Sequence, residues 1–354
     1  MLVQICCSVD SHYFLRKLKE IYPGVRIIGY FYDPNIHPYS EFLLRYDDVK
    51  KSAKTLGIEV ILGDYELDEW FRFVKGLEDE PEKGERCQKC FDFRMEKTAI
   101  LAKKLGESSI TTTLLMSPKK SHSQLEKSLS EICAKFNLDF IAPDFRKNGG
   151  SKAQFDLAKK DNLYHQNYCG CIYAMKMQNK ASLEFELMSS INHQILPNSP
   201  DDRVKFYENL RDLEQKGVKF GIQKDSFINY RLLRGLVKFD EKVVKSYFLF
   251  NSHFERNLVK FSINYECDEF VKNNIIIFSF DKFKELLGVK FKSFDEFLKN
   301  PLSVNEELNL REKICEKGSF SPIIIVEKIV PAKVKIEAFS KIYLDVREIL
   351  VTFW

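Results

Sequence analysis

Apolar residues in the first 140 positions fall into short runs that are separated by longer amphipathic stretches. Five runs predict strands: Leu2–Ile5, Val25–Tyr32, Glu59–Leu62, Ser109–Met116 and Phe140–Ala142. The stretches between them predict helices over about 11–21, 39–56, 66–75, 87–105 and 121–137. This alternation predicts an α/β fold, with a parallel, doubly wound sheet and helices on both faces. Ligands bind such sheets at the carboxyl ends of the strands, where we expect the site.

The pattern changes after about residue 180. Helices are predicted over about 181–196 and 203–216, and Phe- and Ile-rich runs follow that predict strands: Ser246–Phe250, Leu258–Ile263, Asn274–Phe280, Pro322–Ile329 and Ile342–Phe353. We therefore expect two domains, residues 1–180 and residues 181–354. The second is expected to be α+β or mostly β.

Composition narrows the class of protein without identifying its partner. Of the 354 residues, 44% are hydrophobic and 13% are aromatic, as in ordinary globular proteins. No apolar run approaches the roughly 18 residues of a membrane helix, and the segment before Cys7 is too short for a signal peptide. We therefore expect a cytoplasmic protein with no membrane partner. The net charge of +4, from 55 basic and 51 acidic residues, neither requires nor excludes nucleic acid.

Cysteines carry the most specific chemistry in the chain. Six of the nine form three close pairs: Cys6-Cys7, Cys87-Gln88-Lys89-Cys90 and Cys169-Gly170-Cys171. In a reducing compartment, clustered cysteines more often bind metal or do redox work than form disulfides. Six thiolates exceed what one four-coordinate ion can use, and an iron–sulfur cluster takes about four. The two cysteines in excess of four indicate redox or metal chemistry, and not only a metal that stabilises the fold.

The first pair follows a predicted strand and lies at the edge of the sheet. Adjacent cysteines fit a single tetrahedral zinc poorly, so Cys6 and Cys7 are expected to serve two metals, or a cluster and an ion. Otherwise they are two small buried hydrophobes. Asp10, one turn further on, is either an N-cap of the following helix or an oxygen ligand to a second, harder metal.

The other two pairs are less decisive when each is taken alone. Cys87 and Cys90 open a predicted helix with a spacing that suits zinc, thiol redox chemistry and a cluster alike. Gly170 lets the backbone bend so that the sulfurs of Cys169 and Cys171 can face one side.

Read together, these motifs resemble the cobalamin-independent epoxyqueuosine reductase family, which are iron–sulfur enzymes of tRNA modification. The resemblance covers about residues 1–180 and rests on these blocks: Cys6-Cys7; Phe31-Tyr32-Asp33-Pro34-Asn35-Ile36-His37-Pro38 with Glu41 and Arg45; Cys87-x-x-Cys90 with Arg94; Thr113-Leu114-Leu115-x-Ser117-Pro118-x-Lys120; Asp144-Phe145-Arg146-Lys147; and Tyr164-x-Gln166-x-Tyr168-Cys169-Gly170-Cys171-x-Tyr173. Two residues depart from the family pattern. Asp10 stands where many relatives have a third cysteine, and Asp33 stands where the family loop usually begins with asparagine. Residues 181–354 have no counterpart in the short family members.

The resemblance implies a Rossmann-like (HUP-type) sheet and the last step of queuosine synthesis. In that step epoxyqueuosine at the wobble position of tRNA takes up two electrons and two protons, and the epoxide oxygen leaves as water. The implied cofactors are a [4Fe-4S] cluster and an adjacent mononuclear iron. The implied partners are tRNA with a GUN anticodon and an external electron donor.

The same resemblance implies roles for individual residues. The implied metal ligands are Cys6, Cys7, Asp10, Cys87, Cys90, Cys169 and Cys171. A proton would come from Tyr168, His37 or Lys120, and the sequence does not choose among them. The substrate would be bound by Tyr32, Asn35, Arg94, Arg146, Tyr164 and Gln166. Because the base must leave the anticodon stack, aromatic platforms are expected, with Tyr32, Tyr164 and Tyr173 as candidates.

Two rival functions come from other classes. One is a tRNA sulfur-transfer enzyme on the same fold, which ATP hydrolysis would support. However, Cys6-Cys7-Ser8 lacks the glycines of an ATP pyrophosphatase loop. The other is a zinc-stabilised RNA-binding protein without catalysis. The C-terminal domain is expected either to grip the tRNA body or to act as a dimerisation or stabilising module.

Overall fold

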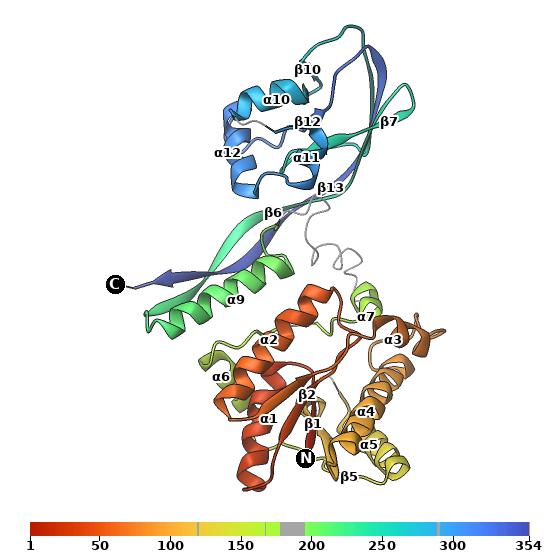
Figure 1. Ribbon diagram of the computed structural model, residues 1–354, viewed down its shortest axis with the longest axis vertical. Coiled ribbons are helices and arrows are strands. Elements are labelled where there is room, and N and C mark those ends of the chain that lie inside the picture. The colour runs from red at the N-terminus through yellow and green to blue at the C-terminus, as the bar shows by residue number, and fades with distance from the viewer. Residues whose placement is uncertain (119, 167, 178–194, 289–290, 354) are drawn as a thin grey trace. The chain divides into compact units, whose positions relative to one another are not determined.

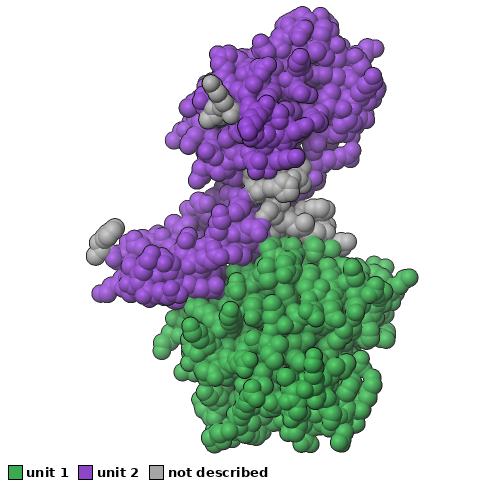
Figure 2. All heavy atoms as spheres, in the orientation of Figure 1, with its two compact units in different colours: residues 1–184 green, residues 185–354 purple. Residues whose placement is uncertain are grey.

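A computed structural model of the chain describes residues 1–118, 120–166, 168–177, 195–288 and 291–353. The chain divides into two compact units, residues 1–184 and residues 185–354 (Figure 2). The domain boundary expected near residue 180 lies outside the described residues, as does almost all of the helix expected over 181–196.

The N-terminal unit is built on a five-stranded sheet in the order β3-β2-β1-β4-β5, in which all neighbours pair in parallel. Its strands are β1 (Leu2–Ile5), β2 (Ile28–Phe31), β3 (Glu59–Leu62), β4 (Ser109–Thr112) and β5 (Asp139–Phe140). The helices are α1 (Ser8–Ile21), α2 (Tyr39–Thr55), α3 (Leu67–Phe73), α4 (Glu85–Leu105), α5 (His122–Phe136), α6 (Gly150–Lys160) and α7 (Ile172–Met177). Figure 1 shows α1, α2 and α6 on one face of the sheet and α4 and α5 on the other. The predicted α/β fold with a parallel sheet is therefore confirmed.

Strand order reverses beside β1, which lies at the centre of the sheet between β2 and β4. All four residues of β1 are buried, since helices cover both of its faces. In doubly wound sheets the crevice for ligands opens where the order reverses, at the carboxyl ends of the strands. Here that point lies between the ends of β1 and β4.

The run Ser109–Met116 was predicted as one strand, but only its first half forms a strand. β4 ends at Thr112, and residues Thr113–Met116 form a turn of 3-10 helix, η1. The hydroxyl of Thr112 accepts a hydrogen bond from the backbone N–H of Leu114 at 3.2 Å, which caps this turn. The turn carries the chain across the carboxyl end of the sheet, next to Cys6.

In its described residues, the C-terminal unit contains two four-stranded sheets, ordered β10-β11-β12-β8 and β7-β6-β13-β9. Their strands are β6 (Phe220–Phe239), β7 (Lys242–Val244), β8 (Ser246–Phe248), β9 (Leu258–Ile263), β10 (Glu269–Lys272), β11 (Ile275–Ser279), β12 (Ile323–Val326) and β13 (Ala332–Thr352). The helices are α9 (Pro200–Gln215), α10 (Phe280–Leu287), α11 (Phe294–Lys299) and α12 (Val304–Ile314). The α+β alternative for this part of the chain is the one observed.

Two large apolar cores lie in this unit, and a smaller one forms around Tyr230 and Phe250. Residues of both sheets form one core, to which Val237, Ile277 and Ile336 contribute, so the sheets pack face to face. The other large core joins the opposite face of the β11–β12 sheet to α10 and α11 through Phe283 and Phe297. The unit therefore has three layers: the helices α10 and α11, the sheet β10-β11-β12-β8 in the middle, and the sheet β7-β6-β13-β9 on the outside.

The long strand β6 was missed from the sequence. It pairs with β13 in antiparallel register from Phe239 to Phe220, and Figure 1 shows the two strands side by side along their length. Charged residues such as Lys224, Asp225 and Arg231 interrupt its apolar pattern, so no run stands out. Within the described residues, no helix has both the length and the apolar character needed to cross a bilayer.

Candidate metal and substrate site

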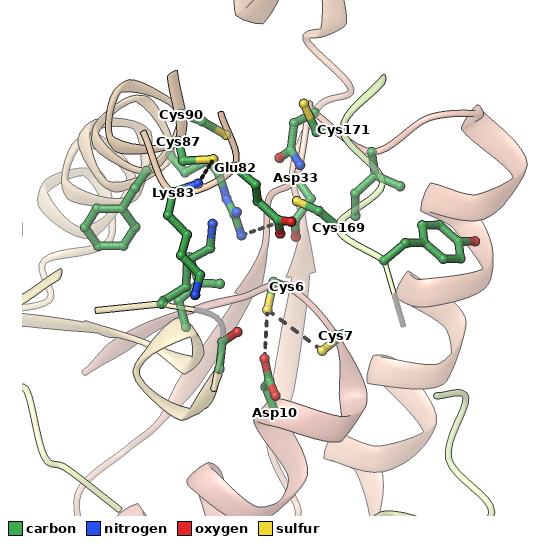
Figure 3. A pocket seen from close by; sticks show the side chains of 18 of the residues that line it. Cys6, Cys7, Asp10, Asp33, Glu82, Lys83, Cys87, Cys90, Cys169 and Cys171 are labelled. Atoms are coloured by element: carbon green, nitrogen blue, oxygen red, sulfur yellow. Dashed lines mark hydrogen bonds and ion pairs between the residues drawn. The ribbon is translucent and has the colours of Figure 1, made fainter. Parts of the chain in front are cut away.

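One cavity of about 280 Å³ lies at the carboxyl edge of the parallel sheet, and all six paired cysteines line it (Figure 3). Cys6 and Cys7 follow β1, Cys87 and Cys90 lie in the first turns of α4, and Cys169 and Cys171 precede α7. The three pairs thus reach the cavity from three segments far apart in the sequence. The sequence predicted the parallel sheet, and its strand order, which only the structure gives, allows this convergence.

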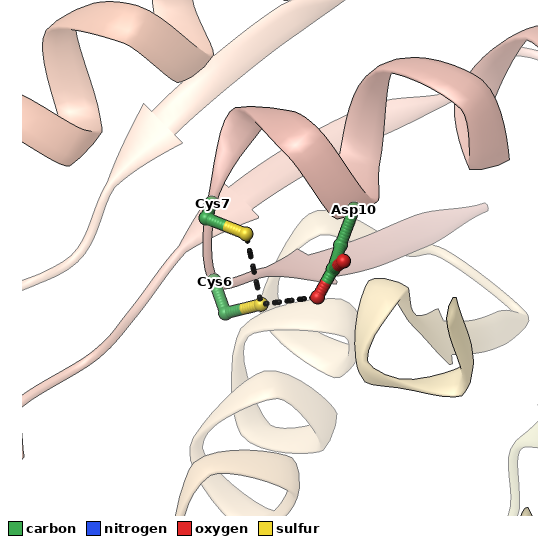
Figure 4. Close-up of side chains that lie close together, drawn as sticks. All are labelled: Cys6, Cys7 and Asp10. Carbon is green, nitrogen blue, oxygen red and sulfur yellow. Dashed lines mark hydrogen bonds between the residues drawn. The ribbon is translucent and has the colours of Figure 1, made fainter. Parts of the chain in front are cut away.

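Cys6, Cys7 and Asp10 form the tightest group of potential ligands (Figure 4). The sulfurs of Cys6 and Cys7 lie 3.9 Å apart, and the Cys6 sulfur lies 3.7 Å from Oδ2 of Asp10. One ligand atom from each residue fits within 4.8 Å of the others. The expectation that adjacent cysteines serve different metals is therefore not required, because the turn from β1 into α1 directs both sulfurs to one point.

Burial dominates the electrostatics of this group. It raises the pKa of Asp10 to about 6, although a hydrogen bond from Gln154 and contacts with both thiols favour the carboxylate. The Gln154 amide nitrogen donates to Oδ1 of Asp10 at 2.5 Å. The pKa of Cys7 is raised by its contact with Cys6 and by burial. Cys7, rather than Asp10, occupies the N-cap position of α1, and no side chain caps the helix there. Asp10 is therefore directed toward the sulfurs.

Cys87 and Cys90 are positioned by the start of α4. The Cys87 sulfur accepts a hydrogen bond from the backbone N–H of Lys83 at 3.3 Å. Buried Arg86 donates to the carbonyl oxygens of Leu77, Glu78 and Glu80, which fixes the acidic loop before the helix. Burial raises the pKa of the Cys90 thiol to about 11. The Cys90 thiol therefore needs a cation nearby to ionise at neutral pH.

The Cys169-Gly170-Cys171 segment is held by the β2–α2 region. Arg45 of α2 donates to the carbonyl oxygens of Cys169 at 3.1 Å and Tyr168 at 3.3 Å. Gly170 has φ +91°, and a Cβ there would lie 3.2 Å from Ile36. Both the left-handed backbone and the close packing call for glycine.

Arg45 is itself held in place. Its Nε donates to Glu41 at 3.0 Å, and the Tyr164 hydroxyl donates to the same carboxylate at 2.9 Å. All three side chains are buried. The bridge Tyr164–Glu41–Arg45 therefore locks the last cysteine pair against α2.

Positive charge surrounds the thiols on one side. Arg94 of α4 forms a buried ion pair with Asp33, and its Nε donates to the carbonyl oxygen of Tyr32 at 3.2 Å. Burial raises the pKa of Asp33 to about 6, against the opposing effect of Arg94. Burial disfavours the charge of Lys120, but the neighbouring thiols, Cys169 above all, outweigh it and raise the lysine pKa. Arg94 and Lys120 thus favour thiolates in this cavity.

The structure brings some of the expected substrate and proton-transfer residues to the cavity and not others. Asn35, Arg94, Lys120, Gln166 and Tyr168 line it. The remaining ones are not among the described residues that line it: Tyr32, His37, Arg146, Tyr164 and Tyr173.

Their contacts explain why these residues lie outside the cavity wall. The Tyr32 hydroxyl donates to Glu66 and its ring stacks on Tyr30, so the fully buried side chain offers no platform for a base. Tyr173 packs against Trp70 and Phe71. Arg146 donates to the carbonyl oxygens of Ser117 and Lys120 at 3.1 and 2.9 Å, which positions the Lys120 loop. The platform role of Tyr32, Tyr164 and Tyr173 thus has no support in the geometry.

Several residues that matter here had no predicted role. Asp33, Glu41 and Arg45 belong to motifs that the sequence singled out, and the spacing of four between Glu41 and Arg45 was a usable signal. Gln154 could not have been found, because it lies 144 residues from Asp10 in an ordinary amphipathic helix.

Comparisons with known proteins find a family model and relatives that match this chain. A family model described as "Epoxyqueuosine reductase QueH" matches residues 1–177. A Helicobacter pylori protein of that name is 37% identical over 347 residues, which cover 93% of this chain and 94% of the relative. A Haemophilus influenzae protein of that name is 37% identical over 182 residues, or 51% of this chain and 73% of the relative.

Among solved structures, a chain described as a predicted subunit of tRNA methyltransferase from Methanocaldococcus jannaschii is similar to this one. It is 17% identical, with a TM-score of 0.34, and the alignment covers 52% of this chain and 91% of that chain. A likeness at this level supports no argument about function.

Proposed function

Because the chain belongs to the epoxyqueuosine reductase QueH family, we infer that it is an oxidoreductase that reduces epoxyqueuosine to queuosine in tRNA. The observation that carries this inference to the present chain is the convergence of six thiols on one cavity. We further propose the wobble nucleotide of GUN anticodons as the substrate and an external electron donor as the reductant. The overall reaction takes up two electrons and two protons and releases the epoxide oxygen as water.

The donor set fits an iron–sulfur cluster with a second metal. Four thiols suffice for a [4Fe-4S] cluster, and six line the cavity. The two remaining sulfurs and a buried carboxylate suit a further ion such as iron. When bound, such a pair would supply electrons and a Lewis acid for the epoxide oxygen.

We propose that Cys87, Cys90, Cys169 and Cys171 hold the cluster. Burial raises the pKa of Cys171 to about 12, and the charges of Cys169 and Cys90 add to this rise, so these three sulfurs lie near one another. Cys6, Cys7 and Asp10 are then left for the second metal, and their ligand atoms lie close enough together to share one ion. Gln154 orients the carboxylate by its hydrogen bond to Oδ1 and leaves Oδ2 toward Cys6.

The cavity also offers groups that suit a polar base. Among the described residues, Oδ1 of Asn35 and Oε1 of Gln166 find no hydrogen-bond partner, and Asn35 is only 2% exposed. An unpaired buried acceptor costs free energy of about 1–3 kcal/mol, so a substrate donor that reaches it gains affinity. We propose that these two amides accept hydrogen bonds from the hydroxyl or N–H groups of the flipped nucleoside.

Proton delivery falls to groups that reach the cavity. Of the three candidates, Lys120 and Tyr168 line it, whereas His37 is not among the lining residues. The Arg45 guanidinium lies 5.3 Å from the centre of the Tyr168 ring, so a positive charge stands beside this side chain. We propose Tyr168 as the donor and Lys120 as a fixed positive charge beside the thiolates.

The test is a turnover assay on tRNA that carries epoxyqueuosine. Protein purified without oxygen, with its iron and sulfide restored, is incubated with this tRNA and a low-potential chemical reductant. Nucleosides are then separated by mass. The expected product has lost one oxygen atom and matches queuosine, and turnover needs the reductant. Unchanged epoxyqueuosine with a fully loaded protein would contradict the proposal.

A further inference from the structure

Where β13 pairs with both β6 and β9, the sheet β7-β6-β13-β9 has an inner face in the core and an outer face with exposed and half-buried side chains. Val237, Val334 and Ile336 point from β6 and β13 into the core between the two sheets. Neighbours along a strand alternate in direction, so Lys238, Lys333 and Lys335 point to the other side. Arg234 and Lys260 are exposed on this same outer side. We call these five residues the basic sheet face.

Three lysines of this face lie in one row across three adjacent strands. Lys335 of β13 pairs directly with Lys238 of β6 on one side and with Lys260 of β9 on the other. Residues that are directly opposite one another share a face, and like charges in that position destabilise a sheet. Strands about 4.8 Å apart place the row within about 10 Å. A row of this kind suits an anion that spans several strands.

Acidic residues offset only part of this charge. Glu337 lies among the cations, at 2.8 Å from Arg234, 3.0 Å from Lys335 and 3.9 Å from Lys238. Asp240 and Glu241 lie in the turn between β6 and β7, at the edge of the face. Five basic residues against the one central carboxylate leave an excess of four positive charges on the face itself.

Large apolar side chains are interleaved with the cations. Phe339 pairs with Arg234 across the strands and is 46% exposed, and Leu258 and Val243 are 47% and 62% exposed. A solvated lysine face has no need of an exposed aromatic ring in its midst. Single-stranded and looped RNA is bound by surfaces that combine cations with exposed aromatic rings.

We propose that the basic sheet face binds the sugar-phosphate backbone of the tRNA substrate, with Phe339 against an unpaired base or a ribose. The proposal rests on the function inferred above, which requires tRNA binding, and it assigns that binding to a surface outside the thiol cavity. Phosphate contacts supply affinity without reading sequence. The face therefore adds affinity for any tRNA, whereas the thiol cavity selects the modified base.

The test is a salt titration of binding to an unmodified tRNA with a GUN anticodon, followed by fluorescence anisotropy. The triple variant Lys238→Gln, Lys260→Gln, Lys335→Gln removes the row. Each lost phosphate contact flattens the plot of log K against log salt by about 0.7–0.9, so we expect a slope reduced by about 2–3. The dissociation constant should rise about tenfold or more at moderate salt.

A matched control removes the same charge elsewhere in the unit. Lys299, Lys313 and Lys317 are exposed lysines on or after α11 and α12, and the triple Lys→Gln variant there should leave the slope unchanged. Glu337→Gln is a test in the opposite direction, because removing this carboxylate makes the net charge of the face more positive by one. It should tighten tRNA binding a few-fold and steepen the salt dependence.

Two outcomes would overturn the proposal. One is an unchanged slope and affinity in the row variant, with circular dichroism like that of the wild type. The other is wild-type binding to anionic phosphatidylserine vesicles, lost in the row variant, with no effect on tRNA. Neither outcome depends on turnover: failure of the reductase assay alone would contradict the proposed function. A row variant that binds tRNA weakly, with a raised KM and an unchanged kcat, would support the role of the basic sheet face in tRNA binding.

Discussion

The two units place their chemistry in opposite kinds of position. In the N-terminal unit, the thiols lie in the turn after β1, in the first turns of α4 and just before α7, and short motifs carry them: Cys6-Cys7, Cys87-x-x-Cys90 and Cys169-Gly170-Cys171. In the C-terminal unit, the cations lie in the middle of long strands and meet only through register, as Lys335 meets Lys238 and Lys260. Local motifs therefore disclose the first site, whereas strand pairing is needed to see the second.

The largest effect on metal content and turnover is expected from a change in the thiol cavity of the N-terminal unit. Cys90→Ala removes a thiol that we assign to the cluster, and a cluster that lacks one of its about four ligands is not retained. Iron and acid-labile sulfide should fall by most of their content, and turnover should fall to background. Cys267→Ala, which changes a cysteine of the C-terminal unit that does not line the cavity, is the control and should keep both. Full activity in Cys90→Ala would remove this residue from the site.

A smaller change separates the two metal positions. Asp10→Ala should lower turnover by about 100-fold or more, because a buried ligand to the second metal is lost. It should keep most of the visible absorbance of the cluster. Gln154→Glu, which places a second carboxylate beside Asp10 Oδ1, should alter the affinity for the second metal without loss of sulfide. Equal loss of iron and sulfide in Asp10→Ala would show that Asp10 is needed for the cluster instead.

A change in Arg45, which holds the Cys169-Gly170-Cys171 segment in place, is expected to have an intermediate effect on turnover. Arg45→Lys keeps the charge but loses the planar guanidinium fork, whose three nitrogens donate to Glu41 and to the carbonyl oxygens of Cys169 and Tyr168. We expect turnover to fall about tenfold, as for the loss of one charge-assisted hydrogen bond of about 1.5 kcal/mol. Arg72→Lys, at the end of α3, is the matched exchange and should have no effect. Wild-type kinetics and metal content in Arg45→Lys would mean that the bridge from Glu41 to the Cys169 segment is dispensable.

The smallest effect on turnover is expected in the C-terminal unit. Tyr247→Phe removes the hydroxyl that donates to Glu307, a fully buried carboxylate. The free energy of unfolding should fall by about 1–2 kcal/mol, which denaturant titration measures, while metal content and kcat stay unchanged. Tyr265→Phe, at a tyrosine 61% exposed, should change neither. A loss of metal in Tyr247→Phe would show that the two units depend on each other for folding.

Much of the N-terminal unit could be predicted because its signals are local. Short apolar runs gave all five strands, and the break of the run at Thr112 was missed because a side-chain cap ends the strand there. The motif residues at strand ends could be named in advance. Their partners could not be, since Gln154 reaches Asp10 from a helix 144 residues away.

The substrate residues show a second limit of sequence reasoning. Tyr32 was an attractive platform by residue type, yet its ring is buried on Tyr30 and its hydroxyl is engaged by Glu66. Side-chain direction depends on packing, which the sequence does not state. In the C-terminal unit, the strand β6 was missed altogether, because mixed charges hide its alternation.

The most direct test of the account is the content of iron, acid-labile sulfide and zinc per chain in protein purified without oxygen. The account predicts about four sulfides and more than four irons, about four for the cluster and one for the Cys6–Cys7–Asp10 position. It also predicts that Asp10→Ala loses the extra iron and no sulfide. Zinc without sulfide would contradict the two-centre site and leave the six thiols with a structural role.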